Sequence, residues 1–276
     1  MPLKKKEITN HHLPYYKLSI VPSLTRRDLN KFLNNLLAPY DFSDYGPNGL
    51  QIEGKQVIKK IAFAVSATAH SIAQTVHEKA DCLIVHHGLF WSFHGAKKIT
   101  GAFHKRIAPL IKSDINLFAY HLPLDAHLEH GNAACLAHAL NMTELTAFGD
   151  YKGSPTGVKG KLTTQLPPLA LKVQLENILN HPVLLACPDE SALISSIGII
   201  TGGANSDWVK AQRAGLQAYI TGEMSEHDWH EAQEANIHMF AGGHNATESL
   251  GIQSLQRLVA KNFTVETLYI PSKNPA

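Results

Sequence analysis

The segment from residue 61 to residue 88, IAFAVSATAHSIAQTVHEKADCLIVHHG, indicates the fold of the chain. Its apolar runs at residues 61–65 and 82–85 are typical of short buried strands, and residues 71–79 between them have the pattern of a helix. A strand, a helix and a second strand in this order predict a pair of parallel strands. The second strand runs directly into two histidines and a glycine, at positions 86–88.

The same alternation of strands and helices continues along the chain and predicts an α/β fold with mostly parallel strands. A helix begins near Thr25, whose spacing to Asp28 resembles a capping box with Asp in place of Glu. Further strands are expected at residues 115–120, 197–200, 218–220 and 238–241, and further helices at residues 104–112, 226–234 and 246–259.

The division of the chain is predicted from its turn residues. Residues 149–160 are rich in Gly, Ser, Pro and Thr and are expected to separate two lobes. We therefore expect a partly ordered N-terminal extension (1–22), a first α/β lobe (23–148) and a second α/β segment (149–276). The extension has three consecutive lysines but neither the apolar region nor the cleavage site of a signal peptide, so we expect a cytoplasmic protein.

Composition excludes several classes of protein. With 276 residues and 44% hydrophobic content, the chain can bury two cores. A net charge of +2 gives no case for nucleic-acid binding, and no apolar run is long enough for a membrane span. The three cysteines lie far apart, which argues against a disulfide framework and a thiolate metal site. The 17 histidines are unusual, and neutral imidazole is a common metal ligand.

Polar residues follow the last apolar residue of each predicted strand, where open α/β sheets bind their ligands. These are His86 and His87, His121 and Asp125, Glu223, and His244 and Glu248. Alternatives remain open at this point: one histidine of the first pair can simply cap its strand, and His121 and Asp125 can be a hydrogen-bonded pair in a loop. His244 and Glu248, four residues apart, can likewise be an ordinary helix start.

Three further features carry weaker predictions. Gly242 and Gly243 precede a helix N-terminus, which favours anions such as phosphate. The TGG (201–203) and TGE (221–223) turns could cradle phosphate or ribose. Trp208 and Trp229 are expected to pack between helix and sheet.

Several motifs in order give the chain a family resemblance. They are YGPNGLQ (45–51), IVHHGLFW (84–91), YHLPLDAH (120–127), TGE (221–223) and AGGHNATE (241–248). With these motifs, which span about residues 28–269, the chain resembles the NIF-three-like dinuclear metal proteins, the group of bacterial YbgI and of the GTP cyclohydrolase I type two homologues. The resemblance implies a two-lobed, three-layer α/β/α fold with mainly parallel mixed sheets and the metal site between the lobes.

The resemblance also implies a site and an assembly. Two divalent ions (Zn, Mn, Fe, Co or Ni) are expected, with a ring-shaped homohexamer around an interior cavity. Carried over by motif, the implied ligands are His86, His87, Asp125, His244 and Glu248. The carboxylates are the natural bridging groups, and His121 matches a residue beside the metals.

The function expected from these features is hydrolysis. Two ions about 3.5–4 Å apart would activate a bridging hydroxide. The implied substrate is a purine nucleotide, attacked at the imidazole ring of GTP, with His121 or Glu223 as the proton-transfer group. Two alternatives are another two-metal hydrolase, such as a phosphoesterase, and a non-catalytic metal-binding or adaptor protein whose metals hold a ring together.

Overall fold

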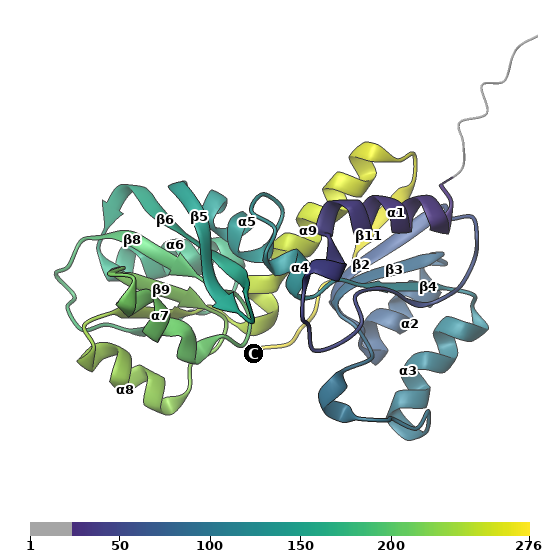
Figure 1. Cartoon of the computed structure of the whole chain (residues 1–276), viewed down its shortest axis with the longest axis horizontal. Coiled ribbons are helices and arrows are strands. Elements are labelled where there is room, and N and C mark those ends of the chain that lie inside the picture. Colours follow the sequence, from purple (N-terminus) through teal and green to yellow (C-terminus); the bar gives the residue numbers. More distant parts are fainter. Residues whose placement is uncertain (1–23) are drawn as a thin grey trace, which may run out of the picture.

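The computed structural model describes residues 24–276 as two lobes, each built on one β-sheet (Figure 1). The expected extension at residues 1–22 lies outside the described residues. Within residues 24–276, no helix combines the length and the apolar character needed to cross a membrane.

The first lobe has a five-stranded sheet between two pairs of helices (Figure 1). Its strands, in spatial order, are β1 (Gly49–Ile52), β4 (Asn116–Ala119), β3 (Cys82–His87), β2 (Lys60–Ser66) and β11 (Glu266–Tyr269). Only β1 is antiparallel to its neighbour. The covering helices are α1 (Arg26–Leu37) and α9 (His244–Asn262) on one face, and α2 (Ala69–His77) and α3 (Gly101–Lys112) on the other.

Local sequence explains these elements. Thr25 caps α1, because its side chain accepts a hydrogen bond from the backbone N–H of Asp28. Every fourth residue of α1, starting at Leu29, is buried against the sheet. In β2, Ile61 packs under α1 and α9 while Ala62 packs under α2 and α3, as the alternation of side chains along a strand requires.

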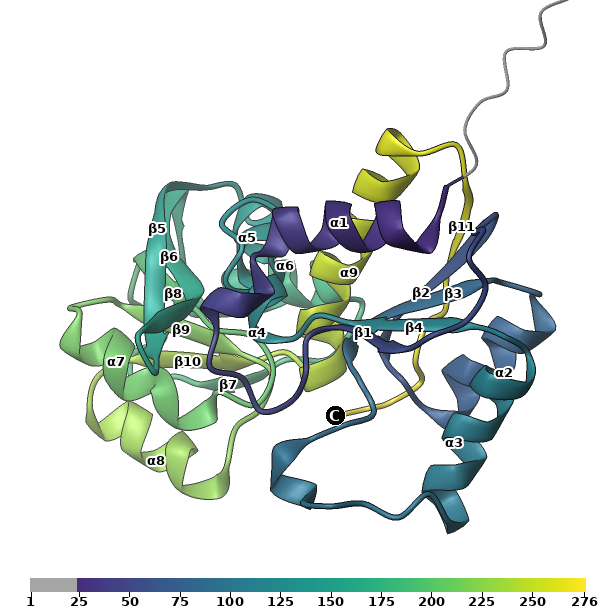
Figure 2. The same cartoon turned by 45° about the vertical axis from the view of Figure 1, so that its right-hand side comes forward.

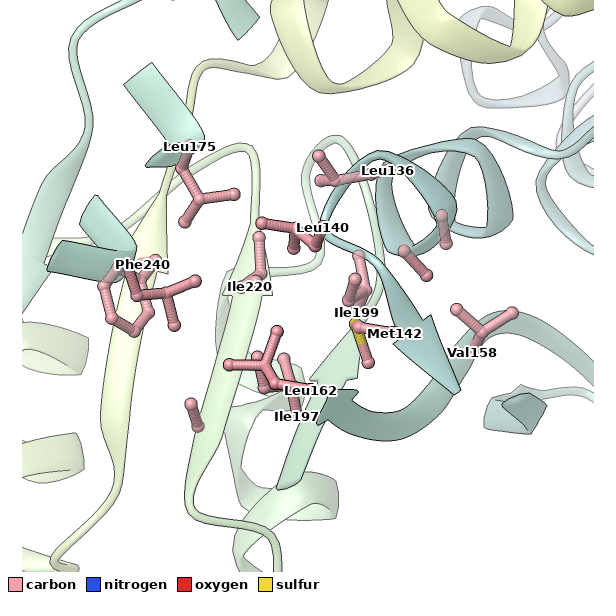
Figure 3. Close-up of a cluster of buried hydrophobic side chains, with 14 of the residues drawn as sticks. Leu136, Leu140, Met142, Val158, Leu162, Leu175, Ile197, Ile199, Ile220 and Phe240 are labelled. Atoms are coloured by element: carbon pink, nitrogen blue, oxygen red, sulfur yellow. The ribbon is translucent and has the colours of Figure 1, made fainter. Parts of the chain in front are cut away.

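The second lobe has a six-stranded mixed sheet, also covered on both faces. Its strands, in spatial order, are β5 (Met142–Tyr151), β6 (Ser154–Leu166), β8 (Ile194–Ile199), β9 (Ala218–Thr221), β10 (His238–Ala241) and β7 (Leu184–Ala186). Strands β8, β9 and β10 are parallel, and the other pairings are antiparallel. One face packs on α5 (Asn132–Ala139) and α6 (Pro168–Leu179), and the other on α7 (Trp208–Arg213) and α8 (Glu226–Glu234). Figure 3 shows the core on the α5 side.

One prediction about the division of the chain is wrong. Residues 149–160 do not separate the lobes, because they form the end of β5, a tight turn and the start of β6. Lys152 and Gly153 in the turn both have positive φ, of 52° and 90°, as a two-residue hairpin turn requires. The glycines and prolines of this stretch therefore serve a hairpin within the second sheet.

The chain passes between the lobes along two helical connections, and after β11 its C-terminal residues return to the cavity between the lobes, where the carbonyl of Pro275 lies 3.0 Å from Nε2 of His181. It leaves the first lobe through the short helix α4 (Leu122–Asp125) and α5, and it returns along α9 to β11 in the first sheet (Figures 1 and 2). Helix α9 contacts α5 in the second lobe as well as β2 and β11 in the first. Three 3-10 turns complete the described elements: η1 (Pro39–Asp41), η2 (Ser92–His94) and η3 (Asn205–Asp207).

Candidate metal centre

The ends of parallel strands from both sheets bring polar side chains to a cavity of about 730 Å³ between the lobes. Strand β3 ends in His86 and His87, and β4 is followed by His121 and α4. Helix α9 starts just after β10. The sequence-predicted residues that line the cavity are His87, His121, Asp125, Glu223, His244 and Glu248.

Glu248 lies at the centre of the cluster. Its Oε1 is 3.4 Å from Nε2 of His86 and 3.3 Å from Nε2 of His244, and its Oε2 is 3.3 Å from Nε2 of His87. The carboxylate of Asp125 also lies near His86, with Oδ2 3.5 Å from Nε2. The possible donors within residues 24–276 form three groups of three. Two of them share Glu248, one with His86 and Asp125 and the other with His87 and His244, and the third joins His121 to His86 and His87.

Two atoms of this cluster are buried without a hydrogen-bond partner. They are Nε2 of His86, whose side chain is fully buried, and Oε2 of Glu248, and neither has a partner within residues 24–276. Leaving a buried polar group unpaired costs about 1–3 kcal/mol. A cation bound between the imidazoles and the carboxylates would satisfy both atoms. Nitrogen and oxygen donors without thiolate suit zinc, manganese, iron, cobalt or nickel, so the residues fit a metal centre.

The second ring nitrogen of each histidine is held by a further group. Nδ1 of His86 lies 3.0 Å from the carbonyl oxygen of Tyr120 and must carry the N–H that donates there. In the neutral imidazole, the lone pair is therefore on Nε2, which faces the cluster. Nδ1 of His87 lies 3.0 Å from Oγ of Ser66, and Nδ1 of His244 lies 2.5 Å from Oε1 of Glu223. Such bonds orient metal-binding imidazoles.

Asp125 is oriented by a buried asparagine that the sequence did not point to. The side-chain amide of Asn132 donates to Oδ1 of Asp125 at 2.8 Å, and its own oxygen accepts from the backbone N–H of Gly251 at 3.0 Å. Oδ2 of Asp125 is left to face His86. Asn132 thereby ties α5 and α9 to the cluster.

His121 has a carboxylate behind it that sequence reasoning also missed. Its Nδ1 lies 2.7 Å from Oδ1 of Asp44, whose side chain is only 2% exposed. Oδ2 of Asp44 accepts from the backbone N–H of Leu122 and from Asn48. Burial opposes the charge of Asp44, but the bond from His121 outweighs it, so the pKa of this carboxyl is lowered. The available signal was its position directly before the motif at 45–51.

Burial and the carboxylates set the charge of the three imidazoles. Burial lowers the pKa of His86, yet Asp125 and Glu248 outweigh it and raise that pKa to about 9. The pKa of His244 is likewise raised to about 9, by Glu248 and Glu223 against the effect of burial. Burial lowers the pKa of His87 to about 3. In Glu248, burial is overcome by the imidazoles, which hold its pKa well below the usual range.

The structure places the remaining predicted features differently. A side chain at Gly202, where φ is +69°, would collide with the carboxylate of Glu248, so the 201–203 turn packs against the cluster. The backbone N–H of Gly202 already donates to Thr247, which leaves it unavailable for phosphate.

Trp208 is buried under the sheet as expected, whereas Trp229 is 43% exposed and that prediction is wrong. In α8 the buried positions are Asp228 and Ala232, so Trp229 points outward.

Comparison with known proteins gives consistent matches over almost the whole described chain. The family model described as Duf34/NIF3 (NGG1p interacting factor 3) matches residues 24–275. A Pasteurella multocida protein named GTP cyclohydrolase 1 type 2 homolog is 41% identical over 249 residues, which cover 90% of this chain and 98% of that protein. The Escherichia coli K12 protein of the same name is 38% identical over the same shares.

Solved structures agree with the sequence matches. The structure titled protein ybgI, of unknown function, has a TM-score of 0.85 and 37% identity, covering 92% of this chain and all of that one. A Thermus thermophilus structure has a TM-score of 0.79 and 27% identity over the same shares. The TM-scores show that the overall fold is shared with these structures, and the chain belongs to the DUF34/NIF3 family.

Proposed function

We propose that this chain is a dinuclear metal-dependent hydrolase acting on a purine nucleotide, in the manner that the name GTP cyclohydrolase 1 type 2 homolog suggests. The observation that carries the proposal is Glu248, a buried carboxylate shared by two groups of metal donors. Divalent ions bound there would lower the pKa of water and supply a hydroxide nucleophile at neutral pH.

The residues of the chain divide into two ligand sets. His86 and Asp125 would hold one ion, His87 and His244 the other, and Glu248 would bridge both, since a carboxylate offers two oxygens. Tyr120, Ser66 and Glu223 hold the second nitrogens of the histidines and so keep the lone pairs aimed inward.

His121 is the group that we propose for proton transfer. Its ring lies 4.9 Å from that of His86 and 5.6 Å from that of His87, and it lines the cavity. The carboxylate of Asp44 holds its Nδ1, which fixes the orientation of the ring. Glu223, the other candidate, is bonded to His244, so we assign it the role of positioning that histidine.

A turnover screen of the metal-loaded protein tests the proposal. GTP and a generic phosphoester are the substrates, Glu248→Gln is the variant expected to lose turnover, and Glu226→Gln, at an 87% exposed side chain on α8, is the matched control. Ring-opened GTP would support the proposal, and release of inorganic phosphate would favour a phosphoesterase. No turnover in a fully loaded sample would favour a non-catalytic metal-binding or adaptor protein.

We also propose that the chain assembles as a homohexameric ring, as the family resemblance implies. The possible donors of both ligand sets are found together within one chain. Light scattering of the purified protein checks the proposal, and a monomeric mass would contradict it.

A further inference from the structure

The cavity beside the metal cluster has a second wall made of aromatic side chains. This aromatic wall consists of Tyr45, Trp91, Phe93 and Tyr151, which all line the cavity. Tyr45 and Trp91 come from loops of the first lobe, Phe93 comes from η2, and Tyr151 comes from the tip of the β5–β6 hairpin in the second lobe. None of them is used by the metal chemistry proposed above.

The aromatic wall touches the histidines of the cluster. The Trp91 ring meets that of His121 edge to face, with ring centres 5.1 Å apart, and its centre lies 5.9 Å from that of His87. The ring of Tyr45 is 6.0 Å from His121. A planar ligand resting on this wall would therefore lie beside the imidazoles where we place the reaction.

Backbone contacts fix the wall before any ligand arrives. The backbone N–H of Ser92 donates to the carbonyl oxygen of Tyr45 at 2.6 Å, which joins the two loops of the first lobe. A side chain at Gly46 would collide with the carbonyl of Phe90, so only glycine permits this approach. The rings of Tyr45 and Tyr151 lie 5.2 Å apart, at 31°. A wall fixed in this way loses little conformational entropy when it binds.

The wall nevertheless leaves much aromatic surface uncovered. Phe93 is 67% exposed and Tyr45 is 37% exposed, although Phe93 also stacks on Trp91 with ring centres 5.7 Å apart. Uncovered apolar surface inside a cavity is typical of a ligand site. Stacking of a nucleobase on an aromatic side chain contributes about 1–3 kcal/mol.

The charges around the wall favour a ring over a polyphosphate chain. Among residues 24–276, Lys210 is the one lysine that lines the cavity, and it is paired with Asp207 at 2.9 Å. A second cation, Lys152, has its Nζ over the rings of Tyr151 and Tyr45, at 5.2 and 5.9 Å from their centres. The wall therefore offers aromatic faces with few free cations.

We propose that the aromatic wall binds a fused heteroaromatic ring of purine size by stacking, with Trp91 as the main contact, and thereby selects the substrate by its ring. The inference rests on the proposed function, because the ring is assigned to the substrate of that hydrolase. It goes further by naming the part of the substrate that is recognised and the residues that recognise it.

Calorimetric titration of the protein as purified tests this inference, with guanosine and ribose 5-phosphate as probes. Guanosine should bind and ribose 5-phosphate should bind far more weakly. Trp91→Leu should weaken guanosine binding about 5- to 150-fold, the range that corresponds to one stacking contact. Trp229→Leu is the matched control, since this exposed tryptophan on α8 lies outside the cavity.

A second variant at another residue of the aromatic wall keeps the test valid if Trp91→Leu misfolds locally. Tyr45→Leu keeps the backbone bond to Ser92 and should also weaken guanosine binding, with metal content measured in every variant. Guanosine that fails to bind, ribose 5-phosphate that binds as tightly, or wild-type affinity in both variants would overturn the inference. If guanosine binding depends on Trp91 but the protein does not turn over GTP, ring binding by the aromatic wall is supported. Only the proposed hydrolase activity is then contradicted.

Discussion

Glu248 is the residue on which the proposed metal centre depends most, because three imidazoles surround its carboxylate. We predict that His86→Ala, Asp125→Ala and Glu248→Ala each lower the metal content without unfolding the protein, since the donors meet only in the folded cavity. Elemental analysis and thermal melting measure both effects. His230→Ala, at an exposed position on α8, is the control, and undiminished metal in all three variants would refute the ligand assignment.

Substitution of His121 distinguishes a metal ligand from a proton-transfer group. We expect His121→Ala to keep at least one metal ion and to slow hydrolysis by about 10²–10⁴-fold, the usual contribution of such a group. Asp44→Asn should also lower the rate of hydrolysis, because Asp44 holds Nδ1 of His121. If His121→Ala loses all its metal, His121 is a ligand and this assignment of roles is wrong.

Metal binding should release protons at neutral pH. Without metal, His86 and His244 have pKa values of about 9 and are protonated at pH 7, whereas His87, at about 3, is already neutral. Because an imidazole binds a cation only after losing its proton, we expect release of about two protons per chain, and weaker binding as the pH falls. Zinc titrations in two buffers of different ionisation enthalpy count the protons. Release of none would contradict the prediction.

At the scale of single elements, Asp228 joins α8 to η3 and α7. Its carboxylate accepts from the indole N–H of Trp208 at 3.0 Å and from the amide of Asn205 at 2.8 Å. Burial opposes its charge, but these bonds outweigh burial and lower its pKa below the ordinary value of 3.8. A lowered pKa stabilises the folded state above pH 3.8, and that stabilisation is lost as the pH falls through the lowered value.

Asp228→Asn should therefore destabilise the protein at pH 7 by about 1–3 kcal/mol, because one donor is left without an acceptor. Urea unfolding measures this loss, and the difference from wild type should shrink as the pH approaches 3. The substitution Asp114→Asn, at an exposed position, is the matched control. Equal unfolding midpoints for wild type and Asp228→Asn at pH 7 would contradict the prediction.

Elements with a clear pattern could be predicted, and those without one could not. The apolar runs of β2 and β3 and the leucine spacing of α1 are sufficient to predict these elements. The polar residues at the strand ends are sufficient to predict the candidate site. The β5–β6 hairpin was missed because β5 is mostly exposed and its turn residues also suit a linker. Asp44 and Asn132 were missed because they meet His121 and Asp125 only in the folded chain.

For the whole molecule, the proposed hexamer should not depend on the metals. The proposed ligands of both ions lie within one chain, so we expect that stripping the ions breaks no bond between subunits. We expect light scattering of chelator-treated protein at neutral pH to give the mass of the untreated protein. A fall from hexamer to monomer would show that the metals are structural and would favour the non-catalytic alternative.

In the proposed metal centre, two ions share Glu248 between the lobes. Anomalous diffraction from crystals of the metal-loaded protein tests it most directly. We predict two peaks, one bonded to His86 and Asp125 and the other to His87 and His244, with metal–nitrogen distances of about 2.0–2.1 Å for zinc and one oxygen of Glu248 on each ion. A single peak, or peaks that lie away from Glu248, would contradict the claim.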